Sequence, residues 1–130
     1  MQRVRFGVIG VGAGVFKMHQ PALQTDRIEV VGVSDINVEA AQARAAEFGC
    51  PSFSDHRDML SATAPEAVAV LAPHPFHAPL ALDALSAGAH VLVEKPMAVQ
   101  VAEADLMIEA AERAGRLLAV NLQNRTRSEI

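Results

Sequence analysis

Residues 4–14 have the sequence VRFGVIGVGAG, and this stretch decides the fold class. It begins with a short apolar run, Val4–Ile9, of the kind that forms a buried strand. The run ends in a glycine turn, GVGAG at residues 10–14, and residues 16–25 have room for a helix directly after it. Glycines in such a turn let the backbone approach a phosphate group, to which the helix N-terminus offers amide donors. The stretch therefore predicts the first strand, turn and helix of a nucleotide-binding α/β domain.

The rest of the chain alternates between apolar runs and segments with helical spacing. Further strands are predicted for Ile28–Ser34 and for residues 51–54, 67–72, 90–93 and 117–121. Further helices are predicted for residues 38–48, 55–60, 77–87 and 101–114, with Asn37 and Asp55 as N-caps and glycines at 49, 88 and 115 after the helix ends. Connections this short between apolar strands require right-handed parallel crossovers. We expect an α/β fold, a doubly wound parallel sheet of about six strands with helices on both faces.

Length and composition narrow the class of protein. The 130 residues suit one compact domain, which we expect to occupy residues 1–122, with residues 123–130 beginning a connection to a further, C-terminal domain. A formal net charge of -4 provides no basic patch, so nucleic acid is not expected as a partner. The lone Cys50 fits a reducing cytoplasm. No segment approaches the roughly 20 apolar residues of a membrane span, so no membrane partner is expected, and four glycines interrupt the N-terminal apolar run that faintly resembles a signal peptide.

The spacing of the glycine turn departs from the dinucleotide-binding pattern G-x-G-x-x-G. That pattern needs a third glycine at position 15, where Val15 stands, and Gly14 comes one residue early. A slightly wider or shifted turn is expected. The shorter pattern, with an acid after the second strand, also describes S-adenosylmethionine-dependent methyltransferases, which remain an alternative at this point.

Asp35 ends the second predicted strand, roughly 20 residues after the last glycine, which is the spacing of the acid that binds the adenosine ribose. Its carboxylate accepts hydrogen bonds from a ribose 2′-hydroxyl and repels a 2′-phosphate, which favours NAD over NADP as the cofactor. The alternative for Asp35 is a helix-entry acid beside Asn37.

Two further motifs follow later strands, where a doubly wound fold binds its ligands. They are APHPFH at residues 72–77 and Glu94-Lys95-Pro96. Together with the opening IGVGAG, the phrase AGAHVLVEKPMA at residues 87–98 and the exit at residues 121–125, they resemble the N-terminal domain of the Gfo/Idh/MocA oxidoreductase family. The resemblance covers essentially the whole chain. The EKP phrase is the most discriminating part, because a methyltransferase has no use for it.

The resemblance implies hydride transfer between a nicotinamide and a hydroxyl-bearing carbon of a sugar, cyclitol or related metabolite. It implies that Lys95 reaches the substrate hydroxyl, and a desolvated lysine near a cationic nicotinamide has a lowered pKa that suits proton transfer. The motifs and the resemblance together assign cofactor binding to Gly10, Val11, Gly12, Ala13, Gly14, Val15, Asp35, Ala72, Pro73, His74, His77, Glu94, Lys95 and Pro96. Asn121, Gln123 and Arg125 are candidates to face the nicotinamide or substrate, and the alternative for them is a solvated polar stretch. For His77 the alternative is a helix-entry residue satisfied by backbone.

The other histidines are not expected to bind a metal. His19 is interpreted as helix packing or polar surface, and His56 and His90 have no partners at metal-ligand spacing, so no metal site is predicted. Members of the family carry a second domain with the remaining catalytic residues and the oligomer interface. We therefore expect this chain alone to bind NAD weakly and to turn over nothing, and the full-length protein to be a homo-oligomer. The alternative function is a non-catalytic dinucleotide-binding sensor or regulatory module.

Overall fold

The computed structural model describes residues 3–12, 15–94 and 100–121. These residues form one six-stranded sheet in the order β3-β2-β1-β4-β5-β6, in which every neighbouring pair is parallel. The strands are β1 (Val4–Ile9), β2 (Ile28–Ser34), β3 (Ser52–Phe53), β4 (Ala67–Val70), β5 (His90–Glu94) and β6 (Leu118–Asn121). The chain runs outward from β1 to β3 and then returns to continue with β4 on the other side of β1, so the order reverses between β1 and β4. Such a switch point is where open α/β sheets bind ligands.

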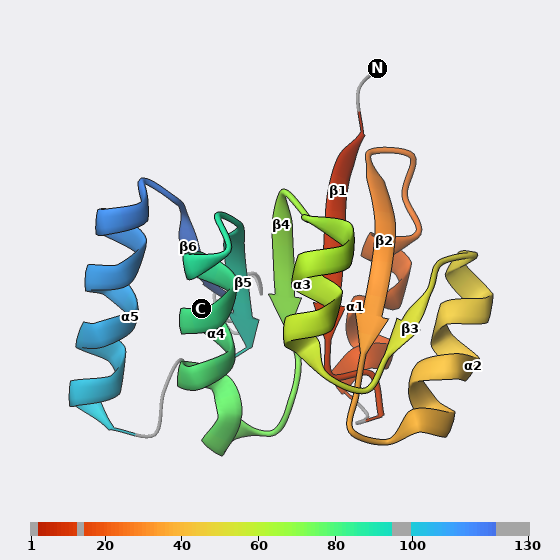
Figure 1. Cartoon of the computed structure of the whole chain (residues 1–130), viewed down its shortest axis with the longest axis horizontal. Helices are drawn as coiled ribbons and strands as arrows, with labels where there is room; N and C mark the ends of the chain where they lie inside the picture. The colour runs from red at the N-terminus through yellow and green to blue at the C-terminus, as the bar shows by residue number, and fades with distance from the viewer. Residues whose placement is uncertain (1–2, 13–14, 95–99, 122–130) are drawn as a thin grey trace, which may run out of the picture.

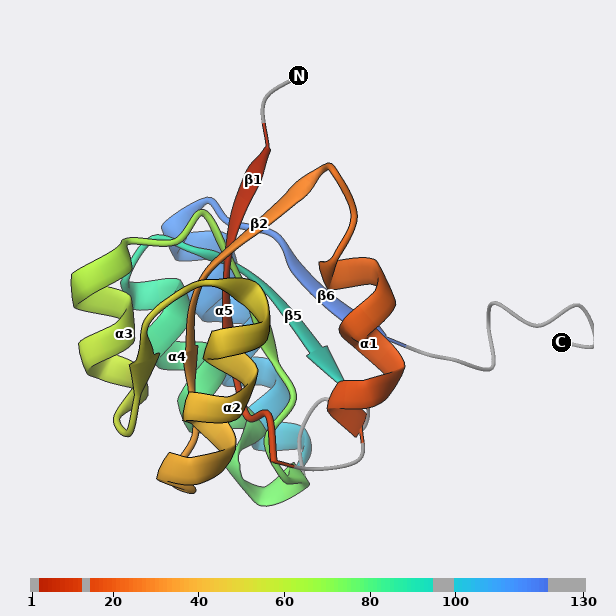
Figure 2. The ribbon, with the colours of Figure 1, turned by 90° about the vertical axis from the view of Figure 1, so that its right-hand side faces the viewer.

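Helices cover both faces of this sheet. They are α1 (Val15–Leu23), α2 (Val38–Phe48), α3 (His56–Thr63), α4 (His77–Ser86) and α5 (Val101–Ala114), with a short 3-10 turn η1 (His74–Phe76) before α4. α1 and α2 pack on one face, and α3, α4 and α5 pack on the other (Figures 1 and 2). The predicted fold class is confirmed. In the described part of the chain, no helix has the length and hydropathy that a membrane crossing requires.

The two faces have separate cores because side chains alternate along each strand. Val8 and Val33 point to the α1–α2 face, where Phe16 of α1 meets Phe48 of α2 edge to face at 6.1 Å between ring centroids. Ile9 and Val70 point to the opposite face, where they pack with side chains of α3, α4 and α5. The central strands are therefore buried on both sides, which explains why they are almost wholly apolar.

The helix ends confirm the capping signals in the sequence. The Asn37 side chain accepts a hydrogen bond from the Ala40 amide at 3.1 Å, and Gly49 ends α2 with a φ of 67°. Three boundaries differ from prediction by two or three residues: α3 continues to Thr63, β4 ends at Val70, and α1 ends at Leu23. In α3 the end comes at Ala64, which adopts a φ of 44° directly before Pro65.

The buried side of α5 is narrower than its sequence predicts, because the three- and four-residue spacing of Ala104, Met107, Ile108 and Ala111 places all four on one face. Met107 and Ala111 are buried, but Ile108, which was placed on the same face, is 46% exposed. Residues 107 and 111 lie four apart on one stripe of the helix, and residue 108 is turned away from that stripe by the helical rotation. Met107 and Ala111 are the buried residues of α5, and Ala110 is partly buried against the same core.

Candidate dinucleotide-binding site

The turn after β1 and the loop after β4 touch through their backbones at the carboxyl edge of the sheet. Gly10 has a φ of +93°, and a Cβ placed on it would lie 2.5 Å from the amide nitrogen of Ala72. Any other residue would meet both a strained backbone and a clash with main-chain atoms. Glycine at this position therefore allows the glycine turn after β1 to contact the loop after β4 directly.

Asp35, at the end of β2, joins the second loop to the glycine turn. Its Oδ2 accepts hydrogen bonds from the amides of Val11 at 2.8 Å and Gly12 at 2.9 Å. Its Oδ1 accepts one from the Asn37 amide at 2.8 Å, next to the start of α2. The structure thus supports the helix-entry interpretation of Asp35 and adds a second role, that of holding the glycine turn.

The Asp35 carboxylate still has capacity for a ligand. An ionised carboxylate offers about four acceptor sites, two on each oxygen. Two amides occupy Oδ2 and one occupies Oδ1, so one acceptor site of Oδ1 remains. That site is sufficient for one hydroxyl donor, such as a ribose hydroxyl.

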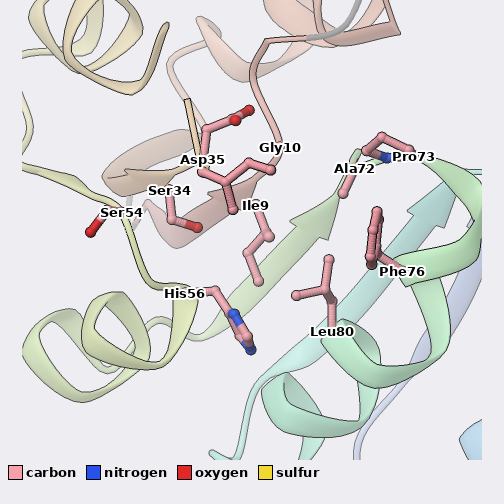
Figure 3. A pocket seen from close by; sticks show the side chains of 11 residues that line it. Ile9, Gly10, Ser34, Asp35, Ser54, His56, Ala72, Pro73, Phe76 and Leu80 are labelled. Atoms are coloured by element: carbon pink, nitrogen blue, oxygen red, sulfur yellow. The ribbon is translucent and has the colours of Figure 1, made fainter. Parts of the chain in front are cut away.

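A cavity of about 280 Å³ opens beside Asp35 on the α3–α4 side of the sheet edge (Figure 3). Its apolar walls are formed by Ile9, Ile36, Ala72, Pro73, Phe76 and Leu80. Its polar side chains are Ser34, Asp35, Ser54 and His56. Pockets for complete small ligands are roughly 300–1,000 Å³. The volume therefore suits one portion of a dinucleotide, and the apolar walls suit a flat base.

His77 holds the loop that forms one wall of this cavity. The imidazole is completely buried, and its Nε2–H donates to the Ala72 carbonyl at 2.7 Å. A carbonyl only accepts, so Nε2 carries the proton. This is the backbone-satisfied state that was the alternative for His77, and a direct contact with the cofactor stays a prediction.

A second polar group lies at the end of β5. Glu94 is 6% exposed, and its Oε2 is paired with Nε2 of His19 from α1. His19 was interpreted as helix packing or polar surface, and the pairing with Glu94 was not foreseen. The interaction joins α1, the helix after the glycine turn, to Glu94, the residue directly before Lys95.

Several predicted site residues cannot be placed. Ala13, Gly14, Lys95, Pro96, Gln123 and Arg125 lie outside the described residues. Three more are placed by their backbone: Val15 begins α1, His74 begins η1, and Asn121 ends β6 in register with Glu94. Their roles, and the expected shift of the glycine turn, stay predictions.

His56 is a pocket residue that sequence reasoning missed. It was considered only as a metal ligand, but its Nε2 contacts Asp83 Oδ2 of α4 at 2.7 Å while the ring lines the cavity. The third histidine of that group, His90, accepts a hydrogen bond from the Leu117 amide through Nδ1 at 2.9 Å. Among the residues that the structure describes, no three His, Cys, Asp or Glu side chains are grouped to hold a metal ion.

Other pocket residues were also missed. Ile36, Phe76 and Leu80 come from three different segments, and no spacing in the sequence shows that they share a wall. For Ser34 and Ile36 a signal was available, because they flank Asp35 directly.

Comparison with known proteins places the chain among oxidoreductases. Residues 4–122 match the model of a family described as an oxidoreductase family with an NAD-binding Rossmann fold. Glucose-6-phosphate 3-dehydrogenase of Bacillus subtilis is 40% identical over 110 residues, covering 84% of this chain and 31% of the relative. D-glucoside 3-dehydrogenase of Escherichia coli is 36% identical over 124 residues, covering 94% of this chain and 35% of the relative.

A solved structure gives the same result in three dimensions. The WlbA dehydrogenase of Bordetella pertussis, in complex with NADH and UDP-GlcNAcA, superimposes with a TM-score of 0.89 at 37% identity. The match covers 95% of this chain and 36% of that one. The chain therefore spans about a third of the length of the relatives that it matches.

Proposed function

The chain belongs to the oxidoreductase family with an NAD-binding Rossmann fold, and on that premise we propose that it is the cofactor-binding part of a sugar or cyclitol dehydrogenase. NAD is the cofactor of this family fold. The proposed reaction is hydride transfer between the nicotinamide and a hydroxyl-bearing ring carbon of the substrate. We also propose that residues 1–122 form the NAD-binding domain and that residues 123–130 lead toward a further domain.

The residues at the sheet edge fit the adenosine half of NAD. The Ala72 backbone lies so close to Gly10 that a Cβ would not fit, and this contact keeps the glycine turn close to the sheet. The free acceptor site of Asp35 suits a ribose hydroxyl, and the apolar cavity beside it suits the adenine. A 2′-phosphate would bring negative charge against this carboxylate, so the proposal includes a preference for NAD over NADP.

The observation that carries the cofactor proposal is the position of the Asp35 carboxylate. It contacts the glycine turn through two amides and borders the apolar cavity at the same time. A helix-entry role at the start of α2 explains the hydrogen bond from the Asn37 amide. It does not explain the contacts of Asp35 with the glycine turn and with the cavity. This arrangement is what an acid that reads the adenosine ribose requires.

For the chemical step, we assign the proton transfer to Lys95. Bound NAD would supply the hydride acceptor. As hydride leaves the substrate carbon, the hydroxyl proton must also leave, and Lys95 Nζ is proposed to take it. Glu94, directly before Lys95, is fixed at the end of β5 by its pairing with His19. The end of β5 is a strand carboxyl end, where this fold places its ligands.

The names of the relatives guide the proposed substrate. Two of them are sugar 3-dehydrogenases, one for glucose 6-phosphate and one for D-glucosides. We propose a substrate of the same class, a sugar or cyclitol with a secondary ring hydroxyl. Most residues that select it would come from the two thirds of the relatives that this chain does not match. The full protein is proposed to be a homo-oligomer.

A chimera tests hydride transfer, because the chain alone is expected to bind NAD without turning over any polyol. Residues 1–121 replace the matching part of D-glucoside 3-dehydrogenase, and reduction of NAD by D-glucosides is followed after NAD binding has been verified. The expected result is turnover that Lys95→Met lowers about 100-fold or more, as for loss of a general base, with NAD affinity retained. A chimera that binds NAD and yet oxidises no D-glucoside would contradict the dehydrogenase proposal and favour a non-catalytic binding module.

A further inference from the structure

Ser34 is a buried polar residue whose hydroxyl has no partner among the described residues. The residue is 1% exposed, and Oγ makes no hydrogen bond with any described part of the chain. A buried hydroxyl without a partner is costly and is therefore uncommon in folded proteins. Ser34 also lines the cavity beside Asp35, so the unsatisfied hydroxyl lies next to the space that a ligand would fill.

The backbone around Ser34 fixes the direction of its side chain. Its carbonyl accepts from the Gly10 amide at 2.9 Å, and the following amide, that of Asp35, donates to the Phe53 carbonyl at 3.1 Å. Ser34 is thus paired with β1 on one side and β3 on the other, in register with Ile9 and Phe53. Successive residues of a strand face opposite sides of the sheet, so Ser34 faces the α3–α4 side with Ile9. The backbone pairing therefore holds the Ser34 side chain on this side of the sheet.

The other polar side chains of the cavity have partners or are turned away. Asp35 accepts from three amides, and His56 is bonded to Asp83. In Figure 3 the hydroxyl of Ser54 is directed away from the cavity, and that of Ser34 is directed toward it, beside Ile9. Among the described lining residues, the Ser34 hydroxyl is therefore the polar side-chain group best placed to receive a ligand.

We propose that the Ser34 hydroxyl forms a hydrogen bond with the adenine base of NAD and helps the site to select an adenine nucleotide. This inference rests on the proposed cofactor site. The ribose and pyrophosphate are polar and belong on the side of Asp35 and the glycine turn. The flat base belongs between the apolar side chains of Ile9, Phe76 and Leu80, which is the side that Ser34 faces. A hydroxyl both donates and accepts, so it can bond either a ring nitrogen or the exocyclic amino group of a purine.

The test compares Ser34→Ala with Ser61→Ala, an exposed serine of α3, by calorimetric titration of the chain with NAD, AMP and nicotinamide mononucleotide. AMP and nicotinamide mononucleotide share a ribose 5′-phosphate and differ in the base. Ser34→Ala is expected to weaken NAD and AMP alike by roughly three- to tenfold, the loss for one neutral hydrogen bond. Binding of nicotinamide mononucleotide is expected to stay unchanged, and Ser61→Ala, outside the cavity, is expected to behave as the wild type with all three ligands.

The ligand-free melting temperature separates a binding role from a structural one. Because the hydroxyl has no partner in the part of the chain that the structure describes, Ser34→Ala should melt at the wild-type temperature or slightly above it. A marked fall in that temperature, or unchanged affinity for NAD and AMP, would overturn the inference. If the wild-type chain bound no NAD at all, the proposed cofactor site itself would fail, which is a distinguishable result.

Discussion

Gly10 adopts its φ of +93° where β1 gives way to the glycine turn, with the Ala72 backbone directly against it. Gly49, at the end of α2, has a similar φ of +67°, but no other atom lies within 4 Å of the position that a Cβ would take there. Both glycines therefore adopt a positive φ that other residues adopt only with strain. Only at Gly10 would a Cβ also clash with neighbouring atoms. Comparing substitutions at the two positions therefore separates the cost of backbone strain from the cost of losing the contact between Gly10 and Ala72.

We expect Gly10→Ala to destabilise the chain more than Gly49→Ala. Both substitutions force an L-residue into the left-handed region at a cost of about 1–2 kcal/mol, and only Gly10→Ala adds a clash with Ala72. Urea unfolding measures the two losses of free energy, and titration measures NAD affinity. Gly10→Ala should lose NAD binding, whereas Gly49→Ala should retain it. Equal effects of the two variants on stability and binding would refute the contact as the cause.

Asp35 gives a prediction about cofactor choice. Asp35→Asn removes the negative charge and leaves a single oxygen for the amides of the glycine turn. We expect NAD affinity to fall roughly 10- to 100-fold, the loss for a hydrogen bond to a charged group, and NADP affinity to fall less. Glu39→Gln makes the same charge change in the first turn of α2 and should leave the NAD-to-NADP ratio unchanged. A ratio that is the same in Asp35→Asn as in the wild type would mean that another group sets the preference.

At the scale of elements, the sequence was sufficient where a local signal marks each end. The bounds of β1, β2 and α2 agree with the prediction, because apolar runs and caps such as Asn37 are signals carried by neighbouring residues. Local signals fail for the pocket walls. Phe76 and Leu80 line the same cavity as Ile36 because β1 lies between β2 and β4 in the sheet. This arrangement belongs to the tertiary structure and leaves no local signal in the sequence.

The same limit applies to the polar contacts of the site. Asp35 was found because its distance from the glycines is part of a motif. The pairing of His19 with Glu94 joins residues 75 positions apart and belongs to no local pattern. Ser34 stands beside Asp35 in the sequence, but its lack of a partner is visible only when the surrounding atoms are placed.

The N-cap of α3 gives a prediction about pH. The Asp55 side chain accepts from the Arg57 amide at 2.8 Å, and this hydrogen bond, with further help from the Arg57 side chain, lowers the pKa of the Asp55 carboxyl. Because the pKa is lower in the folded state, the cap stabilises the fold above the unfolded pKa of about 4, and this stability is lost as pH falls through the folded pKa. α3 begins with His56, so the cap also supports a wall of the pocket.

We expect Asp55→Ala to lower the melting temperature at neutral pH, and Asp55→Asn, which keeps a capping oxygen, to lower it less. As pH falls below about 4, the difference between wild type and Asp55→Asn should shrink, because protonation removes the ionised cap. Melting curves across this range measure the effect. A wild-type advantage that grows toward acid pH would contradict the assigned role of Asp55.

At the scale of the whole molecule, His19 and Glu94 connect the two halves of the sheet. α1 follows β1, near the centre of the sheet, and Glu94 ends β5, so this largely buried pair holds the first crossover helix against the strand that leads to Lys95. By contrast, Arg113 and Glu109 pair on the open surface of α5, with side chains 77% and 58% exposed. The two pairs allow a matched comparison of a buried and an exposed interaction.

Double-mutant cycles should separate these pairs. For His19→Leu with Glu94→Gln we expect a coupling energy of about 0.5–3 kcal/mol, because the two side chains are in contact and largely buried. For Arg113→Ala with Glu109→Ala we expect about 0.5 kcal/mol or less, as is usual for helical surface pairs. Unfolding in urea supplies all the values. Additive effects at His19 and Glu94 would show that their contact does not connect the halves.

The most direct measurement of cofactor recognition is the melting temperature of the chain with NAD, NADP or S-adenosylmethionine. A ligand raises this temperature only if it binds the folded state. NAD should raise it in a concentration-dependent way, NADP should need roughly tenfold or more higher concentration, as one repulsive contact near the carboxylate implies, and S-adenosylmethionine should have no effect. Stabilisation by S-adenosylmethionine alone, or by NADP as readily as by NAD, would contradict an NAD site read by Asp35.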